Sequence, residues 1–291
     1  MPGAFELLGL LAIPALVAAG VTVAFRLGCP QVAARYGLAA ATAVGFLVGS
    51  LVYPERLPLF PVRHWEWLPY LGLIAAFLGS VSAASGVQVW ERVLIYLLLG
   101  GSAAWLLVPT WDTLVPQRPA MIPLVGSYLA LLCTGLSLLP ARLRATRFVG
   151  LLTLASLAVA VGITSESSLR LGELALRVPA AIAGWRIVHA VWKSPSPPEL
   201  GLATCGLIAV YAVLTGGTSF AAAVELTEPR YVLLLLPAAP LMLWPFAWGP
   251  LSRLQGITAI TAQTVAVAVV PIAVLTWLLL TSEPNEWGQW Q

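Results

Sequence analysis

Long apolar runs follow one another along almost the whole chain, separated by short polar or charged segments. A helix needs about 20 apolar residues to cross the hydrocarbon core of a bilayer. The runs predict ten membrane-spanning helices, at 5–25, 36–53, 67–87, 92–109, 120–139, 147–164, 171–192, 200–220, 231–249 and 257–281. Because every connection is short, we expect an all-α polytopic transmembrane bundle, with residues 1–291 forming a single integral membrane domain.

The composition supports this interpretation. Hydrophobic residues make up 59% of the chain and charged residues only 9%, whereas soluble domains carry roughly 25% charged residues. A surface this apolar suits lipid and not water, so the lipid bilayer is the first expected partner. The net charge of +3 is small and dispersed, and it gives no reason to expect a nucleic-acid partner.

The distribution of Lys and Arg predicts an orientation, because cytoplasmic connections carry an excess of both. With connections numbered from the N-terminus, the odd ones hold eight of the 15 basic residues and the even ones hold five. We therefore expect the odd connections in the cytoplasm and both termini outside it, in a bacterial inner membrane. Glu6 stands where a cleaved signal peptide is basic, so 5–25 is expected to be a retained span.

The two halves of the chain show weak similarity. The tetrapeptide GLIA begins at Gly72 and again at Gly206, an offset of 134 (206 − 72). Three further pairs keep a similar offset in the same order: Arg35 with Arg170, Arg92 with Arg230, and Trp111 with Trp248. A duplication with halves 1–145 and 146–291 would give five spans each, and an odd number makes the second copy inverted, as in many secondary transporters. Chance likeness among apolar helices is the alternative.

The seventh span carries the most charge. Glu173 and Arg177 are four residues apart, as a helical ion pair requires, and Arg186 and His189 follow near its end. Ionisable groups at bilayer depth cost roughly 2.5–3.5 kcal/mol on insertion scales, so they usually face the interior of a bundle. The span predicts either a polar stripe that faces a cavity or an internal salt bridge with charges that reach the interface.

The eighth span contains Gly216-Gly217 followed by Thr218 and Ser219. This sequence suggests an unwound turn whose carbonyl and hydroxyl groups line a small site. Glu225 follows, either as a proton- or cation-coupling group or in a solvated turn. The candidate substrate- or ion-binding residues are therefore Glu173, Arg177, Thr218, Ser219 and Glu225. Three prolines between 237 and 245 further predict an irregular ninth span.

A third polar group lies in two even connections: Glu55, Arg56, Arg63, His64 and Glu66 in the first, and Asp112 and Arg118 in the second. An enzyme acting on a lipid head group would use His64 as a base beside a carboxylate. No spacing matches a catalytic signature, so no catalytic residue is assigned. The isolated cysteines and two histidines give no metal-ligand pattern, and no cofactor motif is present.

Three functions remain open. A secondary transporter of a small solute predicts Glu173, Arg177 and Glu225 around one midplane cavity. A non-catalytic subunit or scaffold, bound to other membrane subunits, predicts a tight bundle without a cavity. A lipid-modifying enzyme predicts His64 within reach of Glu66 or Asp112.

Overall fold

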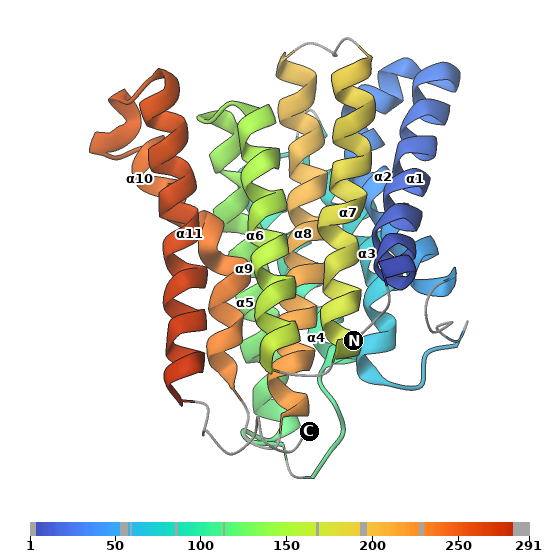
Figure 1. The fold of residues 1–291 in the computed structure, drawn as a ribbon, viewed down its shortest axis with the longest axis vertical. Helices are drawn as coiled ribbons and strands as arrows, with labels where there is room; N and C mark the ends of the chain where they lie inside the picture. Colours follow the sequence, from blue (N-terminus) through green and yellow to red (C-terminus); the bar gives the residue numbers. More distant parts are fainter. Residues whose placement is uncertain are drawn as a thin grey trace.

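A computed structural model describes residues 4–52, 58, 60–84, 87–112, 114–166, 169–192, 197–226 and 230–281. These residues form helices and connections, with no strand among them. The long helices are α1 (Ala4–Gly28), α2 (Pro30–Val52), α3 (Leu68–Ser82), α4 (Val89–Leu107), α5 (Arg118–Ser137), α6 (Ala145–Glu166), α7 (Leu169–Val191), α8 (Pro197–Glu225) and α11 (Gly256–Thr281). Figure 1 shows them side by side in one bundle.

Among the residues that the structure describes, seven helical segments are long and apolar enough to cross a membrane: Gly9–Gly28, Val89–Leu107, Arg118–Ala141, Ala145–Glu166, Leu169–Val191, Ala203–Glu225 and Gly256–Thr281. The protein is thus an all-helical chain compatible with several membrane crossings. Shorter apolar helices occupy Tyr36–Val52 and Tyr231–Ala247. All ten segments expected from the sequence overlap helices, but the count of ten crossings and the inverted repeat stay predictions.

The expected irregularity after residue 230 is confirmed. The segment alternates between η3 (Tyr231–Leu234), α9 (Leu235–Ala238), η4 (Ala239–Leu243), α10 (Trp244–Ala247) and η5 (Pro250–Arg253). Prolines remove backbone donors and clash with the preceding turn, which breaks the helix. The hydroxyls of Tyr128 and Tyr211 donate to the carbonyl oxygens of Leu234 and Pro237, at 2.7 and 3.0 Å. Side chains of α5 and α8 therefore satisfy backbone groups of the broken segment.

The unwound turn expected at Gly216-Gly217 is not present, because α8 continues as an α-helix to Glu225. The two glycines instead make room for neighbouring leucines. A Cβ atom on Gly216 would lie 2.7 Å from Cδ2 of Leu129, and one on Gly217 would lie 2.5 Å from Cδ2 of Leu68. Pairs of small residues in membrane helices commonly serve close packing, and here this use replaces the predicted break.

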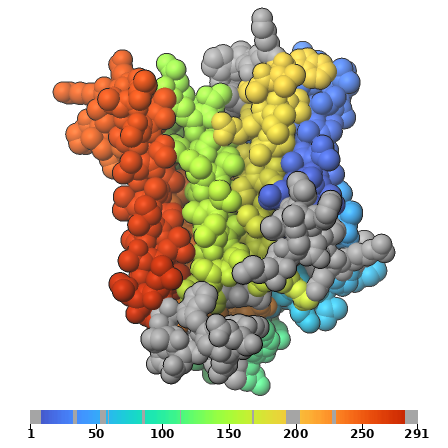
Figure 2. Space-filling view, viewed as in Figure 1, coloured from blue at the N-terminus to red at the C-terminus, as the bar shows by residue number. Residues whose placement is uncertain are grey.

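The α8 helix lies at the centre of the bundle. Residues 206–224 of α8 are all buried, and the helix packs against α2, α3, α5, α6 and α7. The α11 helix lies at one edge, beside α6 and the broken segment. In Figure 2, α11, α6 and α7 lie next to one another across the visible face.

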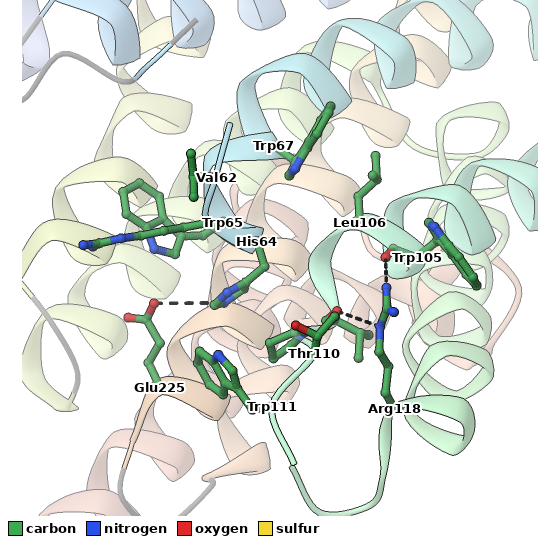
Figure 3. A pocket seen from close by; sticks show the side chains of 13 residues that line it. Val62, His64, Trp65, Trp67, Trp105, Leu106, Thr110, Trp111, Arg118 and Glu225 are labelled. Atoms are coloured by element: carbon green, nitrogen blue, oxygen red, sulfur yellow. Dashed lines mark hydrogen bonds and ion pairs between the residues drawn. The ribbon is translucent and has the colours of Figure 1, made fainter. Parts of the chain in front are cut away.

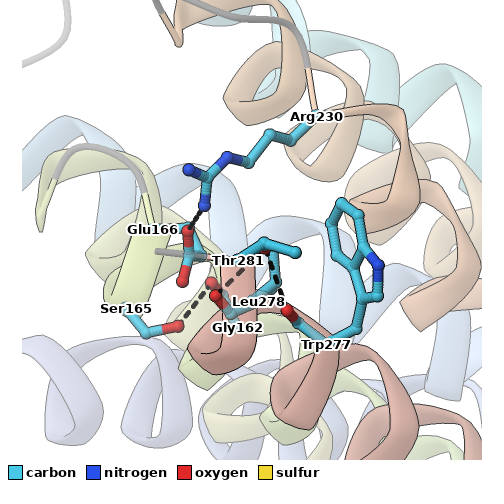
Figure 4. A network of polar contacts seen from close by, with 7 residues as sticks. All are labelled: Gly162, Ser165, Glu166, Arg230, Trp277, Leu278 and Thr281. Atoms are coloured by element: carbon cyan, nitrogen blue, oxygen red, sulfur yellow. Dashed lines mark hydrogen bonds and ion pairs between the residues drawn. The ribbon is translucent and has the colours of Figure 1, made fainter. Parts of the chain in front are cut away.

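Interactions between helix ends bring the four even connections together. His64, before α3, faces Glu225 at the end of α8. Arg230, before η3, pairs with Glu166 at the end of α6 (Figure 4). The hydroxyl of Tyr231 donates to the carbonyl oxygen of Val115, which lies between α4 and α5. We call this part of the bundle the even end.

The opposite part, the odd end, joins the end of α1 to the end of α7. Arg26 donates from Nη2 to Nδ1 of His189 at 3.0 Å and from Nη1 to the carbonyl oxygen of Trp192 at 3.1 Å. The His189 ring stacks on Trp185, with centroids 4.5 Å apart. His189 thus ties two helix ends together at the odd end.

Candidate functional site

A pocket of about 740 Å³ lies at the even end, between η1 (His64–Trp67), the ends of α4 and α8, and the start of α5 (Figure 3). Its walls combine four tryptophans with charged and apolar side chains. The lining residues are Val62, Arg63, His64, Trp65, Trp67, Trp105, Leu106, Val108, Pro109, Thr110, Trp111, Arg118 and Glu225. It lies at the ends of the helices, where a ligand can arrive from outside the bundle.

The η1 turn holds His64 and the tryptophans of this wall in place. One carboxylate oxygen of Glu66 accepts hydrogen bonds from the backbone N–H groups of Val62 and Arg63, at 2.7 and 3.0 Å. A carboxylate that binds these N–H groups caps the turn as in a capping box. Glu66 is therefore a local structural residue, and the pairing with His64 that enzyme chemistry would require is not seen between these two side chains.

The carboxylate that His64 faces belongs to Glu225. Nε2 of His64 lies 4.0 Å from Oε1 of Glu225, and its ring packs edge-on against Trp111, with centroids 5.3 Å apart. Nε2 is buried and makes no hydrogen bond within the described residues. Sequence reasoning singled out both residues but did not foresee that they meet, because they lie 161 positions apart (225 − 64) on different connections.

The imidazole of His64 is neutral at pH 7. Burial and, to a smaller extent, the charge of the adjacent Arg63 lower the pKa of His64 to about 4, while Glu66 acts in the opposite direction. The contact with Glu225 is consequently one between a neutral ring and a carboxyl group, and not an ion pair. A neutral imidazole carries one N–H donor and one acceptor nitrogen, so His64 has a proton-handling atom at the pocket wall.

Arg118 shapes the opposite wall. Its Nε donates to the carbonyl oxygen of Val108 at 3.3 Å and its Nη2 to that of Trp105 at 3.1 Å. These carbonyls end α4, where an arginine satisfies acceptors that the helix leaves unpaired. The guanidinium also lies 5.0 Å from the ring centroid of Trp105, within the range of a cation–π interaction.

Trp65 lies between two cations. The guanidinium carbon atoms of Arg63 and Arg170 are 6.0 and 5.6 Å from its ring centroid. Both arginines also act electrostatically on Glu225. Arg170 opens α7, so the first turn of this helix borders the pocket region. Sequence reasoning used Arg170 as a repeat marker and missed this role, since nothing local to residue 170 indicates a tryptophan from another connection.

The Glu173–Arg177 pair lies further along α7. Arg177 is only 5% exposed, interacts electrostatically with Glu173, and donates from Nη1 to Oγ of Ser50 at 3.1 Å. Ser50 belongs to α2 and donates in turn to the carbonyl oxygen of Phe46 at 2.7 Å. Arg177 thus interacts with Glu173 within α7, and its hydrogen bond to Ser50 joins α7 to α2.

The remaining candidates, Thr218 and Ser219, are wholly buried within α8. Thr218 Oγ1 donates to backbone carbonyls of its own helix, at 2.8 Å to Leu214 and 3.1 Å to Thr215. Oγ of Ser219 makes no hydrogen bond within the described residues. The five candidates accordingly occupy three places: the pocket, the α2–α7 contact and the interior of α8. Their binding role stays a prediction.

Arg186 and His189 do not join this group. His189 lies in the odd-end contact with Arg26, and Arg186 is exposed beside Gly150 of α6. Within the described part of the chain, no three His, Cys, Asp or Glu side chains are grouped to hold a metal ion. The chain matches no protein-family model, and neither a curated protein nor a solved structure matches it. Its function must be argued from the site itself.

Proposed function

We propose that this multi-pass membrane protein is a secondary transporter, and that a small solute binds first in the pocket at the even end. The observation that carries the proposal is the pocket itself, with the contact between the partly buried His64 and the exposed Glu225 in its wall. Ligand sites combine apolar and aromatic walls with a few convergent polar groups. The tryptophans, the two arginines and the His64–Glu225 contact fit that description.

Charged residues on α7 extend from the even end toward the interior of the bundle, and this arrangement favours transport over binding alone. Arg170, Glu173 and Arg177 are spaced three and four residues apart, so they share one face of α7. Arg177 lies eight residues beyond Leu169, roughly 12 Å along the helix. Charged side chains at this depth are costly and mark substrate or ion pathways in many membrane proteins.

The two other functions receive unequal support. A scaffold needs no pocket, and the combination of His64, Glu225 and four indoles around one space is unexpected in a packing surface. A lipid-modifying enzyme is favoured by one specific observation, the 4.0 Å approach of His64 to Glu225. In that case His64 would act as the base and Glu225 as its orienting carboxylate, with a scissile head group in the pocket.

Purified protein in proteoliposomes tests these alternatives. Uptake of radiolabelled inorganic phosphate, glycerol 3-phosphate, lactate, choline, arginine and glucose is measured, one substrate at a time. A second set of vesicles carries a fluorescent phosphatidylglycerol, and its movement between leaflets is followed by dithionite quenching. We expect at least one substrate to cross faster than in protein-free vesicles, and Glu225→Gln to slow that movement roughly tenfold, which corresponds to about 1.4 kcal/mol.

The matched control is Arg253→Gln, which removes an exposed charge from η5, away from the pocket. It should leave the rate unchanged. Movement of no substrate above the protein-free rate would refute transport, and chemical conversion of the labelled lipid without movement would favour the enzyme.

A further inference from the structure

We infer that the pocket at the even end recognises an oxyanion of the phosphate type, carried on an apolar body. This inference names the substrate class and so rests on the proposed function. It follows from four observations on the lining residues: their charge, the unused donors among them, the occupied indole faces and the apolar rim.

The charge of the lining residues favours an anion. Two guanidinium groups, those of Arg63 and Arg118, line the pocket against one carboxyl group, that of Glu225. Arg170 adds a third positive charge nearby. Guanidinium groups present planar, forked donors that match the oxygen atoms of phosphate and carboxylate.

Donors remain for such a ligand. The side chain of Arg63 makes no hydrogen bond and no ion pair within the described residues, and Arg118 uses Nε and Nη2 for the end of α4. Nη1 of Arg118 has no partner there. Nε2 of His64 is a third group, since this nitrogen is buried without a hydrogen bond. Buried polar atoms are nearly always satisfied, and an oxyanion would satisfy Nε2 in its protonated tautomer.

An ammonium ligand is the main alternative, because indole faces also attract cations. Here, however, the cations are already supplied by the protein. Trp65 lies beside Arg63 and Arg170, and Trp105 lies beneath Arg118. The ammonium group of a ligand would be attracted by one carboxyl group but repelled by three guanidinium groups, so the net electrostatic interaction disfavours it.

The rim of the pocket is apolar, which points to an amphiphile. Val62 is 87% exposed and Trp105 is 60% exposed, and Phe60, two residues before Val62, is 85% exposed. Tryptophans and apolar side chains at helix ends are typical of the membrane–water interface. An oxyanion held between the arginines would therefore leave its apolar body against these side chains and the surrounding lipid.

Calorimetric titration of the detergent-solubilised protein tests the inference directly. The probes are dioctanoyl phosphatidic acid, dioctanoyl phosphatidylcholine, dodecyltrimethylammonium and inorganic phosphate. We expect the phosphatidic acid to bind at least roughly tenfold more tightly than the choline lipid or the ammonium amphiphile. Arg63→Gln should weaken that binding by roughly tenfold, as the loss of one charge-assisted contact predicts. Arg63 precedes η1 and is exposed, so this substitution leaves the helices intact.

Arg118→Lys provides a second variant, because it keeps the charge but loses the forked geometry; weaker binding is expected here too. Arg253→Gln, at the odd end, should bind like the wild type. Inorganic phosphate binding as tightly as the lipid would overturn the apolar body and leave a soluble oxyanion as the ligand, whereas weaker phosphate binding would support an oxyanion carried on a lipid.

Equal affinity for the ammonium amphiphile, or unchanged binding by Arg63→Gln, would overturn the inference. Binding without transport in the vesicle experiment would instead refute the proposed function alone, and transport of a cation alone would refute the inference alone.

Discussion

The α8 and α11 helices are similar in the sequence and opposite in the structure. Both are long apolar runs, yet in their most apolar stretches every residue of α8 is buried, whereas only 22% of the residues of α11 are buried. The α11 helix exposes Val265, Val269 and Ile272, as a lipid-facing helix should. Hydropathy therefore identifies both helices as able to cross a membrane, but it does not tell which one lies at the centre.

Small residues and polar groups mark the central helix. Gly206, Gly216 and Gly217 all lie where a Cβ atom would meet a neighbouring helix. The neighbouring α7 carries the buried Arg177, which interacts with Glu173, while α11 carries no charged residue between 256 and 281. Without a hydrophobic force between helices in lipid, close packing and hydrogen bonds decide which helices associate. Substitutions in the central helices and in α11 test this difference.

The largest effect is expected at Arg177. Arg177→Met removes the cation that interacts with Glu173 and the hydrogen bond to Ser50. Removing one partner of a buried pair costs roughly 3–5 kcal/mol, because the other charge is left uncompensated. Arg177 is buried and Glu173 is half-buried, so we expect a loss in the lower part of this range. Unfolding in mixed detergent micelles measures the loss. At the edge, Gln263→Leu on α11 should change the stability by less than about 1 kcal/mol.

The double variant Glu173→Gln, Arg177→Met serves as the control for this prediction. It should recover part of the loss, since no unpaired charge remains. Additive effects of the two substitutions would show that the side chains do not depend on each other.

Acid should destabilise the end of α8 through His64. The pKa of His64 is lowered in the folded protein from 6.5 to about 4, chiefly by burial, so the unfolded chain takes up this proton first. The stabilising contribution is complete above about pH 6.5 and is lost as the pH falls toward 4, by up to about 3 kcal/mol. Unfolding midpoints between pH 7 and pH 4 measure it, and His64→Gln should remove this part of the pH dependence. An unchanged pH profile in the variant would contradict the assignment.

Close approach of α3 to α8 gives the next effect. A Cβ atom on Gly79 would lie 2.6 Å from Cβ of Ala209 and 3.2 Å from the carbonyl oxygen of Gly206, neither of which can rotate away. Gly79→Ala should therefore destabilise the protein by roughly 1–3 kcal/mol through overpacking. Gly20, on α1, has no such neighbour within 4 Å, so Gly20→Ala should stabilise by roughly 0.5–1 kcal/mol through helix propensity. Equal signs for the two substitutions in a thermal unfolding assay would contradict the packing argument.

The sequence predicts the positions of the helices better than the contacts between them. Apolar length locates the helices, and the prolines between 237 and 245 correctly predict the broken segment. The predicted break at Gly216-Gly217 is wrong, because a glycine pair permits either an unwound turn or a tight contact between helices. The leucines that decide between the two come from α3 and α5.

The candidate site follows the same rule. Polar residues in the even connections, His64 among them, could be predicted to form a cluster at one end. The partner of His64 could not, because Glu66 is held by local backbone N–H groups and Glu225 arrives from a distant helix. Local patterns fix caps and breaks, whereas the pocket depends on which helix ends the packing brings together.

The smallest effect on stability is expected at Ser219, and a substitution there distinguishes a structural role from a functional one. Its hydroxyl oxygen is buried in α8 without a hydrogen bond, whereas Thr264 at the edge donates to the carbonyl oxygen of Ile260 at 2.9 Å. Removing an unsatisfied hydroxyl relieves a desolvation penalty, so Ser219→Ala should be neutral or stabilising by about 1 kcal/mol, and Thr264→Ala should be nearly neutral. If Ser219 also binds a passing solute or ion, Ser219→Ala will slow movement across proteoliposomes while the unfolding midpoint is kept. Unchanged transport in a variant that is at least as stable as the wild type would remove Ser219 from the candidate binding residues and leave the pocket as the site to pursue.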